Sequence, residues 1–171
     1  MDLGDVLKGR RSVRRYKAEA VSNDIVLKLI DAAEDAPSAG NLRARKYIAV
    51  TRSETRKALA VASYGQRQID SAPLVIAVCA DVDRSEQRYG DRGSLFAIQD
   101  ATAAVMCLLL AACDLGLGAC WIGAFDDDLV RDILGLEEHM LPIALISIGW
   151  PAEEPRAPPK RNMEEVLIWM N

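Results

Sequence analysis

One hydrophobic stretch dominates the chain: residues 95–113 (LFAIQDATAAVMCLLLAAC) predict a helix of about five turns. From Ala103 to Cys113 this helix has no polar face, and a helix that is apolar on every side must be covered on every side. Its length and the interruptions at Gln99, Asp100 and Thr102 argue against a membrane span. We therefore predict the central buried helix of a globular protein, with a second copy of the chain as part of its cover.

Shorter apolar and amphipathic stretches predict the remaining elements, and the polar residues 81–93 predict a loop or a surface helix before the central helix. Further helices are expected at 3–9, at 22–36 with Ser22 as N-cap, at 53–62 with Ser53 as N-cap, and from 126–128 to 134. Strands are expected at 47–51, 74–80, 118–125 and 141–150.

The chain ends in a proline-rich arm, residues 151–159, which is followed by Lys160 and Arg161 and then by residues 163–170, which include the β-prone residues 166–169 (VLIW). Such an arm cannot pack on itself, so its apolar end is expected to dock on a partner, as in an exchanged C-terminus of a dimer. The alternative is a tail that folds back on its own subunit.

Length and charge narrow the class of protein. The 171 residues predict one domain, 1–171, with 151–171 as its arm. A net charge of -4 argues against a nucleic-acid partner, and the absence of an apolar N-terminal core predicts no signal peptide and a cytoplasmic location. The four cysteines match no metal-ligand spacing, so we expect buried free thiols and no metal site.

Two motifs carry candidate chemistry. Residues 10–16 (RRSVRRY) suit phosphate oxygens, because arginine donates bidentately and serine adds a donor, but a solvated basic turn is equally consistent. Residues 37–41 (PSAGN) have small side chains that let the backbone approach a flat ligand, and Asn41 can both donate to and accept from a ring edge. A plain helix-to-strand connection is the alternative for the second motif.

The usual reactive side chains are missing. The chain has one histidine, no nucleophile elbow, no P-loop and no HExxH motif, and 116–118 follow a helix rather than the strand that a dinucleotide fingerprint requires. An enzyme with this sequence would rely on a bound cofactor. The basic clusters near both ends suggest a cofactor that carries phosphate.

Taken together, six segments of the sequence resemble the nitroreductase family. They occur in the family's order across essentially the whole chain: RRSVRRY at 10–16, APSAGNLRARKY at 36–47, AIQDATAAVMCLLLAA at 97–112, GLGACWIGAF at 116–125, GW at 149–150 and PKRN at 159–162. The resemblance implies an α+β (mixed α/β) three-layer sandwich, with a mostly antiparallel central sheet flanked by helices. It also implies a homodimer that exchanges C-terminal arms.

The resemblance further implies an FMN-dependent oxidoreductase that passes hydride from NAD(P)H to a small electron-poor acceptor, such as a nitroaromatic or a quinone, by a ping-pong mechanism. The flavin would carry the chemistry, so no catalytic side chain is expected. A flavin-dependent reductase or dehydrogenase with a specialised substrate, or a flavin-binding protein without turnover, are the alternatives.

Site residues follow from the same resemblance. One FMN would lie at each subunit interface. Apart from the resemblance, Tyr64 and the segment 81–93, with Tyr89 and Arg92, are expected to wall the substrate slot, and they match no substrate signature. Phosphate and pyrimidine contacts are implied for Arg10, Arg11, Ser12, Arg14, Lys160 and Arg161. Contacts to the ring system are implied for Pro37, Ser38, Ala39, Gly40 and Asn41 of the other subunit, and for Trp121, Ile122 and Gly123. Arg43 stands where the family usually has glutamine, and would either raise the flavin's reduction potential or point to solvent.

Overall fold

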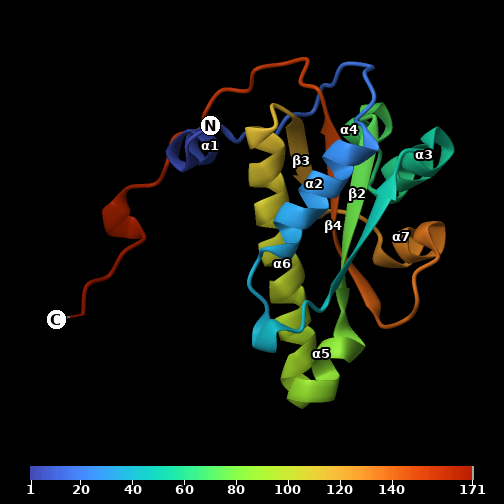
Figure 1. Ribbon diagram of the computed structural model, residues 1–171, viewed down its shortest axis with the longest axis vertical. Helices are drawn as coiled ribbons and strands as arrows, with labels where there is room; N and C mark the ends of the chain where they lie inside the picture. Colours follow the sequence, from blue (N-terminus) through green and yellow to red (C-terminus); the bar gives the residue numbers. More distant parts are fainter. Residues whose placement is uncertain (171) are drawn as a thin grey trace.

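The computed structural model describes residues 1–170, which are built around a four-stranded antiparallel sheet of order β1-β2-β4-β3 (Figure 1). The strands are β1 (Arg45–Val50), β2 (Leu74–Asp81), β3 (Gly118–Ile122) and β4 (Met140–Gly149). The two inner strands, β2 and β4, are buried on both faces, which explains why they read as nearly continuous apolar runs.

Helices cover both faces of the sheet, so the predicted three-layer α+β sandwich is confirmed. They are α1 (Leu3–Gly9), α2 (Asn23–Glu34), α3 (Ser53–Ala62), α4 (Arg67–Ser71), α5 (Val82–Tyr89), α6 (Gly93–Asp114) and α7 (Asp127–Leu134), with single 3-10 turns η1 (Ala39–Asn41), η2 (Gly90–Arg92) and η3 (Met163–Glu165). Helices α2 and α6 lie on one face, and α3, α4 and α7 lie on the other (Figure 1).

The alternation of side chains along the strands feeds two cores. In β2, Ile76 and Val78 pack into the core beneath α2 and α6, whereas Val75 and Ala77 belong to the core beneath α3 and α7. Successive side chains of a strand point to opposite faces of the sheet. A central strand that is covered by helices on both faces therefore needs an apolar residue at every position.

Two of the predicted helix starts are capped by a side chain, and a third is not. The Ser22 hydroxyl accepts from the N–H of Ile25 at 3.4 Å, and the Asp126 carboxylate accepts from the N–H of Leu129 at 3.0 Å. Ser53, predicted as an N-cap, is instead the first residue of α3, and no side chain caps that helix. The sequence offers a serine near the right place, but the chain turns into the helix one residue earlier.

Helix α6 is only partly covered by its own chain. Leu95 and Met106 remain 44% and 38% exposed, while the opposite side of the helix packs on α2 and on the sheet. By length and composition alone, the stretch Val82–Asp114, which comprises α5, η2 and α6, could cross a membrane, and 44% of its most apolar window is buried within the chain. The core helix of a globular protein passes the same test.

Other segments differ in detail from the expectations. Residues 81–93 form the surface-helix alternative, as α5 and η2. Cys79 and Cys120 are buried free thiols as predicted, but Cys107 and Cys113 are only half-buried because they lie on the less covered side of α6.

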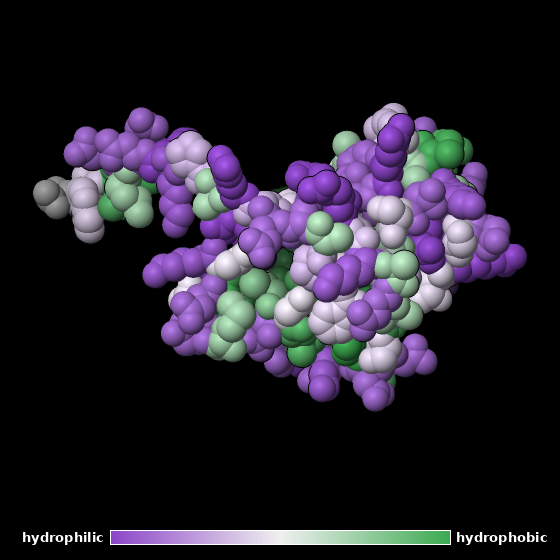
Figure 2. Space-filling view, turned by 90° about the horizontal axis from the view of Figure 1, so that it is seen from above, coloured by the Kyte–Doolittle hydropathy of each residue, from purple (hydrophilic) through white to green (hydrophobic). Residues whose placement is uncertain are grey.

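The C-terminal arm leaves the sheet beside the N-terminal segment, where the N–H of Ala152 donates to the carbonyl of Arg15 at 2.9 Å (Figure 1). It then extends away from the body of the molecule (Figure 2). Its β-prone end forms no strand: Ile168 and Trp169 are 85% and 78% exposed, and only the η3 turn precedes them. A strand needs an edge to pair with, and within the described residues the arm reaches none. Exchange of the arm in a dimer stays a prediction.

Candidate functional site

A basic groove of about 510 Å³ lies where the two ends of the chain meet. This volume lies within the range typical of small-molecule sites, about 300–1,000 Å³. The lining residues include five cations and no acid: Leu7, Arg10, Arg11, Ser12, Arg14, Pro155, Arg156, Ala157, Pro158, Pro159 and Lys160. The structure thus brings four of the predicted N-terminal residues together with Lys160 within one chain, while the exposed Arg161 is not among the lining residues.

The N-terminal wall of this groove is held against the edge of the sheet. The N–H of Val13 donates to the carbonyl of Ala119 in β3 at 3.0 Å, and Ser12 lies opposite the same residue. A Cβ placed on Gly118 would lie 2.7 Å from a methyl carbon of Val13. Glycine at position 118 therefore permits the close approach that puts 10–14 in place.

The C-terminal wall is tied to the N-terminal wall by Glu153. Its carboxylate accepts hydrogen bonds from the backbone N–H of Arg14 at 2.6 Å and of Arg15 at 3.1 Å, and it also pairs with the Arg15 side chain at 2.9 Å. The backbone hydrogen bond from Arg14, with the bond from Arg15, holds the pKa of Glu153 below its ordinary value. The arm therefore begins at a fixed place beside the groove.

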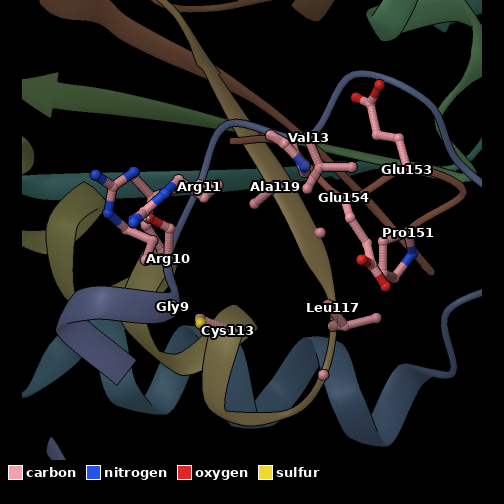
Figure 3. A pocket seen from close by; sticks show the side chains of 14 residues that line it. Gly9, Arg10, Arg11, Val13, Cys113, Leu117, Ala119, Pro151, Glu153 and Glu154 are labelled. Carbon is pink, nitrogen blue, oxygen red and sulfur yellow. Dashed lines mark hydrogen bonds between the residues drawn. The ribbon is translucent and has the colours of Figure 1, made fainter. Parts of the chain in front are cut away.

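A second, smaller hollow of about 270 Å³ adjoins the groove and shares Arg10 and Arg11 with it (Figure 3). Its walls are otherwise mostly apolar, with Glu153 and Glu154 across from the two arginines. Burial raises the pKa of the half-buried Cys113 thiol in this hollow, and the charges of Arg10 and Arg11 only partly oppose that shift.

The loop after α2 has an unusual backbone. Gly40, Asn41 and Arg43 have φ values of 56°, 56° and 48°. Glycine adopts this region freely and asparagine tolerates it, but for Arg43 it costs about 1–2 kcal/mol. A Cβ at Gly40 would collide with the hydroxyl of Tyr89. Strain of this kind persists only where the surrounding structure enforces it, and it is frequent at ligand sites.

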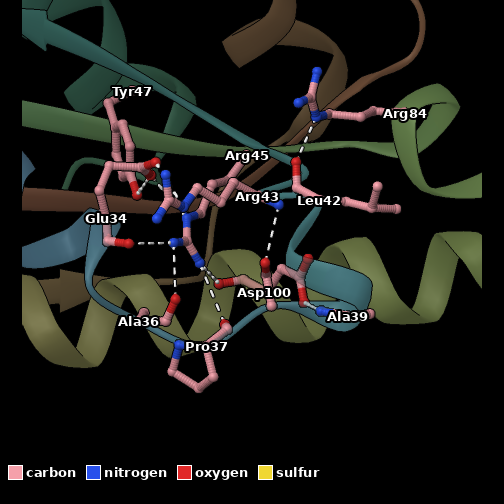
Figure 4. A network of polar contacts seen from close by, with 11 residues as sticks. Glu34, Ala36, Pro37, Ala39, Leu42, Arg43, Arg45, Tyr47, Arg84 and Asp100 are labelled. Atoms are coloured by element: carbon pink, nitrogen blue, oxygen red, sulfur yellow. Dashed lines mark hydrogen bonds and ion pairs between the residues drawn. The ribbon is translucent and has the colours of Figure 1, made fainter.

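A buried polar network holds the backbone of this loop in place (Figure 4). The fully buried Arg45 side chain donates from Nε to Glu34 Oε1 at 2.9 Å and from Nη2 to the carbonyl of Ala36 at 3.0 Å. Asp100 of α6 accepts from the N–H of Ala39 at 2.9 Å. The sequence analysis missed Glu34, Arg45 and Asp100, although an arginine at a buried strand position and an aspartate within an apolar helix are the signals that could have revealed them.

The N-terminal and C-terminal segments that line the groove lie near one end of α6, and the loop lies near the other (Figure 1). The loop is anchored at Asp100, whereas the segment leading into the groove contacts Cys113, whose sulfur lies 3.8 Å from the carbonyl oxygen of Val6. Thirteen residues of helix separate these anchors, which corresponds to about 20 Å. A single chain therefore does not bring Pro37, Ser38, Ala39, Gly40 and Asn41 to the groove.

The remaining predicted site residues are also split between the two ends of the molecule. Trp121 is 37% exposed at the outer strand, the Ile122 side chain is buried in the core, and Gly123 is exposed, with nothing closer than 3.5 Å to a Cβ placed there. Tyr64, at φ 57°, is on the turn before Gln66, whose amide donates to the carbonyl of Ala124 at 2.9 Å.

Tyr89 and Arg92 instead lie at the other end of the molecule, beside the loop. The Tyr89 ring packs edge-on against Phe96 at 5.0 Å between centroids, and the Arg92 guanidinium lies 5.1 Å from the same ring. Because α5 and α4 are at opposite ends of the molecule, one chain does not gather the three residues predicted to wall the substrate slot.

Comparison with known proteins places this arrangement in a family. The model of the nitroreductase family matches residues 7–69 and 62–150. The chain is 32% identical over 193 residues to a Thermus thermophilus protein named NADH dehydrogenase, covering 94% of this chain and 92% of the relative. It is 30% identical over 171 residues to an oxygen-insensitive NADPH nitroreductase of Salmonella typhimurium, covering 95% and 71%.

A solved structure agrees with these sequence matches. The NADPH:FMN oxidoreductase from Vibrio harveyi, complexed with NAD+, superimposes with a TM-score of 0.89 at 25% identity, covering 98% of this chain and 76% of that one. The antiparallel sheet, the central helix, the loop and the N-terminal wall of the groove fall within the residues that the family model matches, whereas the arm residues of the groove, 155–160, lie beyond them. The chain therefore belongs to the nitroreductase family.

Proposed function

We propose that this chain is an FMN-dependent NAD(P)H oxidoreductase that acts in the cytoplasm on electron-poor acceptors such as nitroaromatics or quinones, by a ping-pong mechanism. Family membership supports flavin chemistry with a nicotinamide donor, as do relatives named as an NADPH nitroreductase and an NADPH:FMN oxidoreductase. The observation that carries the proposal is the basic groove, in which cations from both ends of the chain converge.

The groove suits the phosphate of FMN. A phosphomonoester carries nearly two negative charges at neutral pH, and Arg10, Arg14, Arg156 and Lys160 all line the groove without an acidic residue among them. Hydrogen bonds between charged groups contribute about 1.5–3 kcal/mol each. In this proposal Arg10, Ser12 and Lys160 bind the phosphate, and Arg14 lies at the polar edge of the flavin.

The ring system requires a second copy of the chain. The small-residue loop lies about 20 Å along α6 from its own groove, so in this proposal it packs on the flavin that the partner's groove holds. Two features support a homodimer: the incompletely covered face of α6, and an arm whose end leaves Met163, Ile168, Trp169 and Met170 more than two-thirds exposed. Burying these side chains on a partner would be favourable by about 25 cal/mol per Å².

The residues of the chain position and shield the reaction rather than take part in it. When bound, FMN supplies the chemistry, which is acceptance of hydride from NAD(P)H and its delivery to the acceptor in alternate half-reactions. The exposed Gly123 leaves room for a ring to approach its backbone N–H, and Arg14 offers a fixed positive charge at the edge where negative charge develops. No side-chain acid or base is needed.

The test uses the purified full chain, loaded with FMN and handled without oxygen. We expect a yellow protein whose absorbance near the flavin band bleaches with NADH or NADPH and returns when a quinone or nitroaromatic is added. Arg10→Ala should weaken FMN binding, whereas Lys57→Ala, a charge removed from the exposed surface of α3, should not. A wild-type chain that binds no FMN, or bound FMN that neither nucleotide reduces, would contradict the proposal.

A further inference from the structure

Two arginines share one carboxylate beneath the loop. Oε1 of Glu34 accepts hydrogen bonds from Arg45 Nε at 2.9 Å and from the Tyr47 hydroxyl at 2.8 Å, while Oε2 lies 3.9 Å from Arg43 Nε. Arg45 is fully buried and Arg43 is 54% exposed. Glu34 therefore faces a permanently charged interior partner on one side and a surface cation on the other.

The position of Arg43 is fixed by the loop itself as well as by Glu34. Its backbone N–H donates to the Ser38 hydroxyl at 3.0 Å, which closes the turn that contains Ala39, Gly40 and Asn41. The buried Arg45 binds the carbonyls just before that turn. The Arg43 guanidinium is thus a half-exposed cation beside the Glu34 carboxylate, on the residue whose backbone closes the small-residue turn.

We propose that Arg43 is a cation that raises the reduction potential of the flavin packed against this loop, and that Glu34 positions Arg43 and attenuates its charge. The inference rests on the proposed function, because it needs the loop to lie beside FMN. Two-electron reduction makes the flavin more negative at its polar edge, so a nearby positive charge favours the reduced form and a nearby negative charge disfavours it.

Opposite signs distinguish this role from a purely structural one. Removing the charge of Arg43 should make reduction less favourable, whereas removing the charge of Glu34 should make it more favourable. A structural defect of the loop would change FMN affinity in both variants in the same direction, without a reason for potentials of opposite sign. Because Arg43 is half-exposed, the effect should also shrink as ionic strength rises.

The experiment measures the midpoint potential of FMN bound to the full chain, against a reference dye without oxygen, for wild type, Arg43→Gln and Glu34→Gln. We expect Arg43→Gln to lower the equilibrium constant for two-electron reduction by about tenfold, or about 30 mV, and Glu34→Gln to raise it. Arg52→Gln is the matched control, because it also removes an arginine from an exposed ion pair, with Glu54 at 3.4 Å, but lies outside the loop.

The wild type is measured first, for FMN binding and reduction by NAD(P)H, and a failure there overturns the proposed function and this inference with it. If wild type succeeds, equal potentials in wild type and both variants, or shifts of the same sign, overturn the inference alone. Should Glu34→Gln fail to fold, because Arg45 loses its carboxylate, Arg43→Glu replaces it. The reversed charge must then lower the potential further than Arg43→Gln does, and an equal or smaller shift overturns the inference.

Discussion

The carboxylate of Glu153 lies 2.6 Å from the backbone nitrogen of Arg14, a residue 139 positions earlier in the chain. The same carboxylate accepts from Arg15 as well. This contact joins the start of the C-terminal arm to the N-terminal segment, and it therefore sets the spacing between the two walls of the basic groove.

The Glu153 contact predicts a pH dependence. Its pKa is lower in the folded state than its ordinary value of 4.5, so the contact stabilises the fold above that value and is lost as the pH falls through the folded-state pKa. We expect Glu153→Gln to reduce amide hydrogen-exchange protection at Arg14 and Arg15 at pH 7. The difference from wild type should disappear in acid, when the two proteins are compared at the same pH. A difference that is the same at all pH values would contradict this assignment.

Removing cations from the arm should weaken FMN binding. Lys160→Ala and Arg156→Ala each take a positive charge from the groove, and the loss of one charge-assisted bond corresponds to about tenfold or more in Kd. Fluorescence titration of FMN measures this directly. Lys57→Ala provides the control, and an unchanged Kd for both arm variants would show that the arm does not reach the phosphate.

Gly118→Ala should destabilise the fold, because its new methyl group would lie 2.7 Å from Val13. Overpacking of this kind typically costs about 1–3 kcal/mol, measurable by urea denaturation. Gly9→Ala is the matched control, since the added methyl meets nothing closer than 3.5 Å. If both variants were equally stable, the segment 10–14 would not depend on close contact with β3.

A substitution at Tyr64 tests whether its strained backbone is retained because the side chain contributes to the acceptor site. It is 73% exposed and has a φ of 57°, so its side chain adds little to the core while its backbone is strained. Tyr64→Gly should raise the free energy of unfolding by about 1 kcal/mol and raise the KM for the acceptor. Tyr64→Phe keeps both the ring and the strain, and should change neither; a Tyr64→Gly enzyme with unchanged KM would remove this residue from the slot.

More of the fold than of the candidate site could be predicted from the sequence. Apolar runs such as 74–80 and the 95–113 helix predicted the central strands and the central helix, because burial on both faces leaves a signal at every position. The capping role of Ser53 was wrong, because capping depends on where the chain turns and not only on residue type.

The site was harder to predict because its parts are assembled by long-range contacts. The grouping of Arg10, Arg14 and Lys160 came from a resemblance, and nothing local indicated that Arg156 would line the same groove. The buried pair of Glu34 and Arg45 was missed, because its members are polar residues in different elements whose partners only the tertiary structure reveals. Likewise, the sequence gives no distance between the loop and the groove along α6.

The most direct test of the account asks whether each flavin site is shared between two copies. Arg10→Ala/Arg14→Ala disables the groove, and Gly40→Val disables the loop, because position 40 has a φ of 56° and a side chain there would also displace the Tyr89 hydroxyl and the Arg88 guanidinium. The two variant chains are co-expressed with different tags and purified as mixed dimers. Each mixed dimer should bind one FMN, because the intact groove of one chain faces the intact loop of the other. Dimers of either variant alone should bind none. Mixed dimers that bind no FMN would contradict the shared site.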